Sequence, residues 1–448
     1  MITMHIAPDQ RPPAVSLQQA FWYWLKLGFI SFGGPAGQIA LMHAELVERR
    51  RWISERRFLH ALNYCMLLPG PEATQLAVYI GWLMHGTRGG VQAGALFLLP
   101  SLLILIGLSW IYLVFGNLPV IAGILYGIKP AVVAIVLAAA WRIGTRTLKN
   151  ASLIAIAVAA FLAISALQLP FPLVVAIAAA LGWAGARWRP SQFHIGGQHP
   201  DAKTSYGLAL IDDDTPTPPH ALFSWTALLK VAGIGAALGL GLWVLIVALI
   251  GPDSVLAQMA WFFTKAALLT FGGAYAVLPY IYQGGVEQFH WLSATQMIDG
   301  LALGETTPGP LIMIVAFVGF VGAWSHALLS GSGLAAGVAG AAVAACFTFL
   351  PSFIFILAGG PLVESTRDNL RMTAPLTAIS AAVVGVIVSL ALFFAQHIFW
   401  ADGWTGRWDS AAIALSAAAC LALFIFKTGP IKVLCACAVA GLVLSYWH

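Results

Sequence analysis

Charged side chains are scarce in this chain. Its 448 residues include 22 Lys and Arg and 17 Asp and Glu, or 9% charged, while 60% are hydrophobic. An average soluble domain is roughly 25% charged and 45–50% apolar. So few charges cannot cover a water-soluble surface. Apolar runs of about 20 residues, the length that crosses a hydrocarbon core, recur at 91–115, 122–141 and 231–250. The sequence therefore predicts an all-α, polytopic membrane protein and excludes a soluble one.

Catalytic and metal-binding patterns are also missing. The five cysteines lie in apolar segments without metal or redox spacing, which predicts buried free thiols. No His-Glu-x-x-His, Gly-x-Ser-x-Gly or phosphate-loop motif occurs. An intramembrane enzyme that uses His43, His60, Asp299 or Glu305 is therefore only a minor alternative. We expect no catalytic residue, no cofactor and no metal. The net charge of +5 is attributed to cytoplasmic loops and not to a nucleic-acid partner.

The chain repeats itself. A shift of 239 residues places 31–34, Ser-Phe-Gly-Gly, on 270–273, Thr-Phe-Gly-Gly, and it places the Pro-Gly-Pro at 69–71 on the Pro-Gly-Pro at 308–310. The same shift pairs Lys26 with Lys265, and further along the chain the offset becomes 251. The predicted organisation is a first repeat at 1–188, a polar cytoplasmic linker at 189–221, an extra transmembrane helix at 222–250 and a second repeat at 251–448.

The basic residues predict that the repeats have opposite topology. The loop at 47–57 contains five arginines, whereas the equivalent loop at 286–296 contains no Lys or Arg. Since Lys and Arg concentrate on cytoplasmic loops, these loops are expected on opposite sides of the cell inner membrane. An inversion requires an odd number of membrane crossings between equivalent points of the two repeats, and the extra helix makes that number odd. Each repeat is expected to hold two broken-helix hairpins and about four full crossings, with the amino terminus cytoplasmic and the carboxyl terminus external.

The repeated breaks are the predicted substrate pathway. Glycine permits a break, and proline, which lacks an amide hydrogen, suits a helix's first turn. Helix starts at Pro35, Pro71, Ala274 and Pro310 would therefore present free amides and the positive end of the helix dipole to an anion. Packing kinks are the simpler alternative, but broken helices at corresponding positions favour a transport site. The predicted pathway residues in the breaks are Ser31, Gly33, Gly34, Pro35, Gln38, Pro69, Gly70, Pro71, Thr270, Gly272, Gly273, Thr306, Thr307, Pro308, Gly309 and Pro310.

Five charged residues lie in or beside apolar segments. Lys26, Lys265 and, with less support, Lys129 are candidate anion ligands, because a buried lysine needs a counter-charge or a ligand. Snorkelling to the membrane surface is an equal alternative for Lys26 and Lys265. Glu72 and Glu305 flank the breaks, and desolvation favours the neutral form of a carboxyl group, so both are candidates for proton coupling. A helix-capping role stays open for Glu72.

Four segments resemble the chromate ion transporters in their long, two-domain form. The segments are 32–38, Phe-Gly-Gly-Pro with Gln38; 67–73, Leu-Leu-Pro-Gly-Pro-Glu-Ala; 271–273, Phe-Gly-Gly; and 304–310, Gly-Glu-Thr-Thr-Pro-Gly-Pro. The resemblance covers both halves. It implies efflux of chromate across the inner membrane, driven by the proton motive force as in an antiporter, and hence chromate resistance. It also implies halves in opposite orientations, in agreement with the charge argument.

The residues alone support a less specific function. Chromate and sulfate are tetrahedral dianions of similar size, so a transporter of sulfate or of another oxyanion is the main alternative. A passive anion channel is a lesser alternative, and saturation of flux would distinguish it from a carrier. The expected partners are chromate or sulfate, protons and the lipid bilayer. A homodimer stays open.

Overall fold

The computed structural model describes residues 11–188, 190–193, 206–271, 273–326, 332–365, 374–400 and 407–446. Within these ranges the chain is helical apart from its loops and one isolated β-bridge between Ile53 and Ile211. Six of the described helices are long and apolar enough to cross a membrane. The protein is therefore an all-α, multi-pass membrane protein, as the composition predicts.

The described helices of the two repeats follow one another in the same order. The first repeat comprises α1 (Leu17–Ile30), α2 (Gly34–His43) with the π-helical turn η1 (Ala44–Arg49), α3 (Glu55–Leu67), α4 (Glu72–Phe115), α5 (Pro119–Thr147), α6 (Ala151–Ser165) and α7 (Phe171–Trp188), and the short α8 (Pro190–Phe193) follows in the linker. The second repeat comprises α10 (Val255–Leu269), the short turns η3 (Ala274–Val277), α11 (Leu278–Tyr282) and η4 (Gln283–Gln288), then α12 (Ala294–Thr306), η5 (Leu311–Met313), α13 (Ile314–Ser325), α14 (Gly333–Ser365), α15 (Ala374–Phe399), α16 (Ser410–Phe424) and α17 (Pro430–Ser445). Counterparts match in length: α3 and α12 have 13 residues each, and α6 and α16 have 15 each.

The first repeat begins with two hairpins that return to one end of the molecule. The long α4 leaves helical geometry at His85 and Gly86, so its first part closes the second hairpin and its second part crosses the molecule. The hairpin ends contact each other, because the His85 ring lies 2.7 Å from the carbonyl oxygen of Val15. The loop between the hairpins is hydrogen-bonded to residues 206–221 of the linker. The Leu210 amide donates to the Arg51 carbonyl at 2.8 Å.

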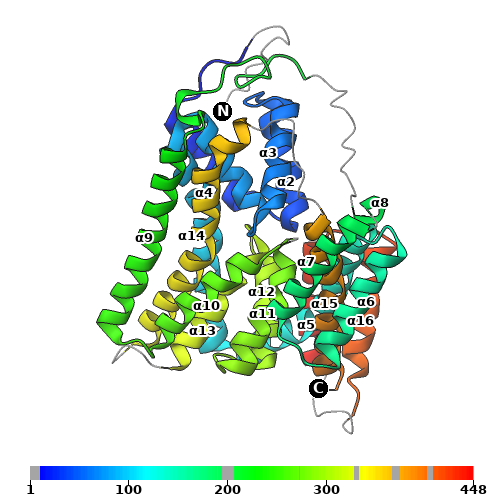
Figure 1. Ribbon diagram of the computed structural model, residues 1–448. Coiled ribbons are helices and arrows are strands. Elements are labelled where there is room, and N and C mark those ends of the chain that lie inside the picture. Colours follow the sequence, from blue (N-terminus) through cyan, green and yellow to red (C-terminus); the bar gives the residue numbers. More distant parts are fainter. Residues whose placement is uncertain are drawn as a thin grey trace.

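The second repeat has the same hairpins at the opposite end. In Figure 1 the hairpins formed by α2, α3 and the start of α4 lie in the upper part, whereas those formed by α10 to α13 lie in the lower part. Met259 at the start of α10 and Trp291 in the loop before α12 both contact Gly322 near the end of α13. This arrangement is the inverted repeat that the arginine asymmetry predicts.

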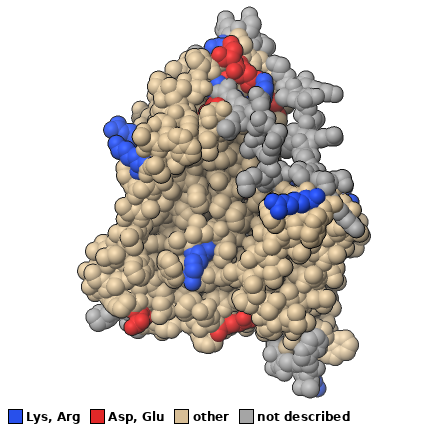
Figure 2. All heavy atoms as spheres, in the orientation of Figure 1, with Lys and Arg blue, Asp and Glu red and all other residues tan. Residues whose placement is uncertain are grey.

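Two helix groups support the hairpins. α4 and α14 cross the molecule beside each other with the hairpins packed on them, while α5, α6 and α7 pack on α15, α16 and α17 (Figure 1). Glycines permit the closest contacts: Gly319 of α13 meets Gly340 of α14, and Gly127 of α5 meets Gly441 of α17. On the face in Figure 2 the acidic side chains lie toward the two ends, and isolated basic side chains lie between them in a broad, otherwise uncharged belt. Such a belt suits the hydrocarbon core of a bilayer.

The extra segment between the repeats forms α9 (Trp225–Ile250) at one side of the molecule (Figure 1). It packs on α14 and α10 and contains no buried residue. A helix that is apolar on all sides yet unburied is suited to face lipid. The polar linker before it is described at 190–193 and 206–221 only, and its second part lies on the loop that precedes α3.

Candidate functional site

Glycine makes each described break possible. Gly33 before α2 and Gly34 at its first position have φ values of 93° and 70°, and Gly273 before η3 has a φ of 101°. Gly70 and Gly309 in the two Pro-Gly-Pro elements have φ values of 123° and 97°. Side chains other than hydrogen are strained in this left-handed region. Gly272, also predicted to belong to the pathway, lies outside the described residues.

The breaks of one repeat bond to the breaks of the other. The Gly70 amide donates to the Thr270 carbonyl at 2.7 Å, and the Gly309 amide donates to the Ser31 carbonyl at 2.8 Å. Under the 239-residue shift, Gly70 corresponds to Gly309 and Ser31 to Thr270. The two hydrogen bonds are therefore copies of each other across a pseudo-two-fold axis. The breaks, far apart in sequence, meet at the interface between the repeats.

A serine faces each of these glycines from a long helix. A methyl group on Gly309 would lie 2.7 Å from Cβ of Ser101 on α4, and one on Gly70 would collide with Ser352 on α14. The two serines correspond under the 251-residue offset. We call Gly309 with Ser31, Gln38 and Ser101 the Gly309 junction. Gly70 with Thr270, Gln75 and Ser352 is the Gly70 junction.

Each junction contains one glutamine, and both glutamines come from the first repeat. The Gln38 side-chain amide donates to the Gly309 carbonyl at 2.5 Å, and that of Gln75 donates to the Pro69 carbonyl at 2.7 Å. Both are part of the first repeat, and Val277 and Ile314 occupy the equivalent positions in the second. The polar side-chain donors at the breaks therefore come mainly from the first repeat.

Several polar atoms at or beside the junctions are buried without a hydrogen-bond partner in the part of the chain that the structure describes. Burying such an atom without a partner costs free energy, so native proteins supply water or a ligand. These atoms are Ser31 Oγ, Gln38 Oε1, Thr74 Oγ1, Gln75 Oε1 and Ser101 Oγ. The junctions are therefore a polar site within an apolar protein, equipped with hydroxyl groups that can donate to an anion.

Within the hairpins, helix caps distinguish the breaks from the helix starts that precede them. Helices α1, α3, α10 and α12 begin with a serine whose hydroxyl accepts from a first-turn amide. Helices α2 and α4 begin at the breaks with no side-chain cap, from Gly33 and Pro71 respectively. Their first-turn amides are therefore left for another acceptor. Glu72 already places a carboxyl group in the first turn of α4, whereas the first turn of α2 contains no acid.

Helical turns begin at or directly after all four predicted positions, but their first turns differ between the repeats. Ala274 begins a 3₁₀ turn of four residues, and Pro310 precedes one of three residues. Pro35 does lie in the first turn of α2, but Pro71 is the residue before α4. Each 3₁₀ turn continues directly into an α-helix, η3 into α11 and η5 into α13, so the helix starts of the second repeat have a tighter first turn.

The threonines have other partners. The Thr270 hydroxyl donates to the Ala266 carbonyl at 2.7 Å, that of Thr306 to Leu303 at 2.7 Å and that of Thr307 to Gly304 at 2.9 Å. These are local bonds to the preceding helical turn. Each hydroxyl's single proton is thus already committed within its own helix, and the expectation that these threonines donate to an oxyanion has no support in this conformation.

The charged candidates lie in three surroundings. Lys26 and Lys265 are exposed on α1 and α10, and the Lys265 ammonium lies 5.7 Å from the ring centre of Trp261. This exposure favours snorkelling over a place in the junctions. Glu305, at the end of α12, accepts a hydrogen bond from the Tyr275 hydroxyl at 2.6 Å. The positive charge of Arg146 on α5 attracts the carboxylate of Glu72. One turn away on the same helix, the positive charge of Arg142 attracts the carboxylate of Glu305.

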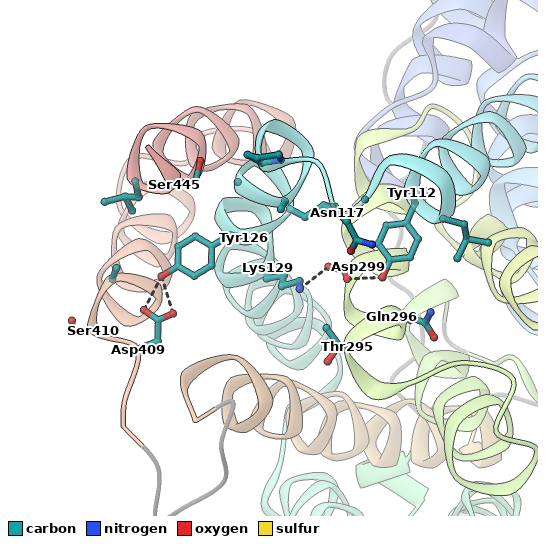
Figure 3. Close-up of a pocket in the computed structure, with 18 of the residues that line it drawn as sticks. Tyr112, Asn117, Tyr126, Lys129, Thr295, Gln296, Asp299, Asp409, Ser410 and Ser445 are labelled. Carbon is teal, nitrogen blue, oxygen red and sulfur yellow. Dashed lines mark hydrogen bonds and ion pairs between the residues drawn. The ribbon is translucent and has the colours of Figure 1, made fainter. Parts of the chain in front are cut away.

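Lys129 pairs with a residue that was not predicted as a transport residue. Its ammonium lies 3.2 Å from Asp299 Oδ1, and the Tyr112 hydroxyl donates to Asp299 Oδ2 at 2.9 Å (Figure 3). The sequence indicates Asp299 only for the alternative of an intramembrane enzyme. The rule that a lysine at membrane depth needs a counter-charge could have found it, because few acidic residues lie in the apolar segments.

Comparison with known proteins identifies the family. The family described as Chromate transporter matches residues 18–183 and again 257–442, one match in each repeat. The chain belongs to the chromate transporter family. It is 33% identical to the chromate transport protein of Pseudomonas aeruginosa over 86% of this chain and 82% of that one. It is 30% identical to the probable chromate transport protein of Synechococcus elongatus over 86% of each.

Shorter relatives of the chromate transporter family correspond to part of the chain. The uncharacterized transporter YwrB of Bacillus subtilis is 30% identical over 161 residues, which are 35% of this chain and 82% of that protein. A region smaller than half of this chain thus makes up most of another transporter. No solved structure matches the chain significantly.

Proposed function

We propose that this protein exports chromate across the cell inner membrane, driven by the proton motive force, and so confers chromate resistance. The supporting observation is that uncapped helix starts and unpartnered hydroxyl groups meet where the two inverted repeats join. Relatives named as chromate transport proteins indicate the substrate. The transport names of these relatives also favour a carrier over an enzyme.

The proposed binding position is the start of α2. Gly33 and Gly34 leave the backbone open there, and no atom lies within 4 Å of a methyl group built on Gly34. The first-turn amides and the hydroxyls of Ser31 and Ser101 would donate to the oxygens of a tetrahedral dianion. Chromate would reach this position from one side and leave toward the other as the repeats move against each other.

The membrane potential alone favours export of a dianion. With the cell interior negative, each charge gains about 2.3 kcal/mol per 100 mV, so a dianion gains roughly 4.6 kcal/mol. Glu305 is the proposed proton carrier, because it is partly buried, lies four residues before Gly309, and has a Tyr275 partner that can stabilise the ionised form. Protonation and deprotonation of Glu305 would add the pH gradient to the driving force.

Flux measurements in inverted vesicles test this proposal. Vesicles that contain the protein should accumulate chromate in the lumen when a proton pump energises them, and collapse of the potential and the pH gradient in turn should each reduce uptake. Absence of uptake, or uptake indifferent to both gradients, would refute coupled export. A saturating rate would exclude a passive channel.

Sulfate is the second candidate substrate. Nothing about amides and hydroxyl groups distinguishes two tetrahedral dianions of similar size. Addition of sulfate to the same vesicles measures the selectivity directly. Inhibition of chromate uptake at sulfate concentrations near those of chromate would identify a general oxyanion transporter, and no inhibition would support a chromate-selective one.

A further inference from the structure

A cavity of about 960 Å³ lies between the repeats, away from the junctions. Its walls come from α4, the α4–α5 turn and α5 of the first repeat, and from α12, α16 and α17 of the second (Figure 3). We call it the vestibule. It includes Asn117 in the α4–α5 turn, which the charge rule predicts on the external side.

One ion pair joins the repeats across the vestibule. Lys129 extends from α5 and Asp299 from α12, with the Lys129 side chain 24% exposed and the Asp299 side chain 3% exposed. Tyr112 from α4 holds the second carboxylate oxygen of Asp299. Lys129 is thus the accessible member of the pair, and it is the cation among the residues found to line the vestibule.

The other wall carries a second carboxylate. Asp409 precedes α16, accepts the Tyr126 hydroxyl at 2.7 Å and caps the Ala412 amide at 2.8 Å. With Asp299 and Asp409 ionised and Lys129 protonated, the charged residues lining the vestibule sum to +1 − 2 = −1. A dianion would be repelled, and the positive charge of Lys129 would already be balanced by Asp299. Protonation of Asp299 removes one negative charge from the lining of the vestibule and leaves the charge of Lys129 available to an anion.

We propose that the vestibule is a second oxyanion-binding site, in which Lys129 binds the anion while Asp299 holds a proton. The proton comes from water and adds to the carboxylate, and the Lys129 ammonium then exchanges Asp299 Oδ1 for an oxygen of the anion. No covalent bond forms. The inference deepens the proposed function and rests on it for the class of anion.

Few other titratable groups face Asp299. Lys129 reaches it from α5 and Tyr112 from α4, while Asp409 and Tyr126 lie across the vestibule (Figure 3). The elements η5 and α13, which also pack on α12, contain no titratable residue. The titratable residues of α15 and α17 do not line the vestibule. They are His397, Lys432, Cys435 and Cys437.

Helix α12, which carries Asp299, connects the vestibule to the Gly309 junction. Asp299 and Glu305 are six residues apart on this helix, or about 9 Å along its axis. The site has no copy at the opposite end, because the 239-residue shift places His60 at the position of Asp299. The vestibule is therefore specific to one side of the protein.

Equilibrium binding of sulfate and of chromate to the full-length protein in lipid nanodiscs tests the site. Wild-type affinity for sulfate, which stays a dianion throughout, should rise as the pH is lowered from about 8 to about 4, because an aspartate carboxyl group ordinarily gains its proton near pH 4. Asp299→Asn imitates the protonated state, so it should bind about tenfold more tightly at the higher pH and lose the pH dependence. Lys129→Gln should lose this binding component, and Lys129→Arg should keep it.

Controls separate this site from a structural ion pair. Tyr126→Phe, in the same cavity, removes a hydroxyl that bonds to Asp409 and keeps the Lys129–Asp299 pair, so it should keep the pH dependence of the wild type. The double variant Lys129→Gln with Asp299→Asn removes both charges, so it should fold and bind weakly at both pH values. Wild-type affinity and pH dependence in both single variants would overturn the vestibule site while leaving chromate transport intact. Failure of wild-type vesicles to transport any oxyanion would instead overturn the proposed function.

Discussion

Single residues determine how closely the repeats meet. Gly309 combines a left-handed φ of 97° with a serine 2.7 Å from where its methyl group would lie. The sequence identifies this glycine through its repetition, but it does not reveal that Ser101 faces it. The Lys129 and Asp299 pair was missed for a similar reason, because partners 170 residues apart are brought together only by the packing of α5 on α12.

Alanine at Gly309 should therefore impair transport. The left-handed backbone costs an alanine about 1–2 kcal/mol, and displacement of the junction should reduce chromate flux by about tenfold or more. Gly107→Ala is the matched control, since it lies in α4 with nothing within 4 Å of the added methyl group, and it should transport normally. Vesicle flux normalised to inserted protein decides between them, and equal flux in both variants would contradict the role of the junction.

Glu305 is the residue on which proton coupling depends in this account. Glu305→Gln keeps the shape and can still bond to Tyr275, but it cannot exchange a proton. We expect chromate uptake that no longer responds to a pH gradient, with insertion into the membrane unchanged. Tyr275→Phe removes only the hydrogen-bond partner and should keep the response at a shifted pH. Gradient-driven uptake at the wild-type rate in Glu305→Gln would exclude this glutamate as the proton carrier.

At the scale of elements, the breaks and hairpins were predictable and the helix types were not. Proline and glycine mark where helices stop, so the chain positions of the breaks followed from the sequence. Whether an α-helix or a 3₁₀ turn begins after Gly273 or Pro310 depends on tertiary contacts. Gln38 and Gln75 have no glutamine counterparts in the second repeat, so the first repeat is the more polar side of the site.

The α9 helix has a topological role in this account. It contains no buried residue, so packing alone gives little reason for it, but it supplies the odd crossing that inverts the second repeat. Deletion of 225–250 should move a carboxyl-terminal reporter from the external to the cytoplasmic side and abolish chromate flux. A reporter that stays external would contradict the charge-based topology. Replacement of α9 by an unrelated apolar helix of equal length should restore both properties.

For the whole molecule, duplication and inversion create the site. Neither repeat contains both halves of a junction, because the Gly70 amide needs Thr270 and the Gly309 amide needs Ser31. The fold class and the inverted arrangement followed from composition, the repeated motifs and the arginines. The contact surfaces of the repeats did not, since apolar helices of similar composition can pack in many ways.

The location of bound chromate tests the central claim most directly. Anomalous diffraction at the chromium edge, from crystals of the full-length protein grown with chromate, would locate the metal atom of the anion. The account predicts a chromium peak beside the start of α2, within hydrogen-bonding reach of the Ser31 hydroxyl. A chromium peak only at the exposed Lys26 or Lys265, or no peak near either junction, would contradict it.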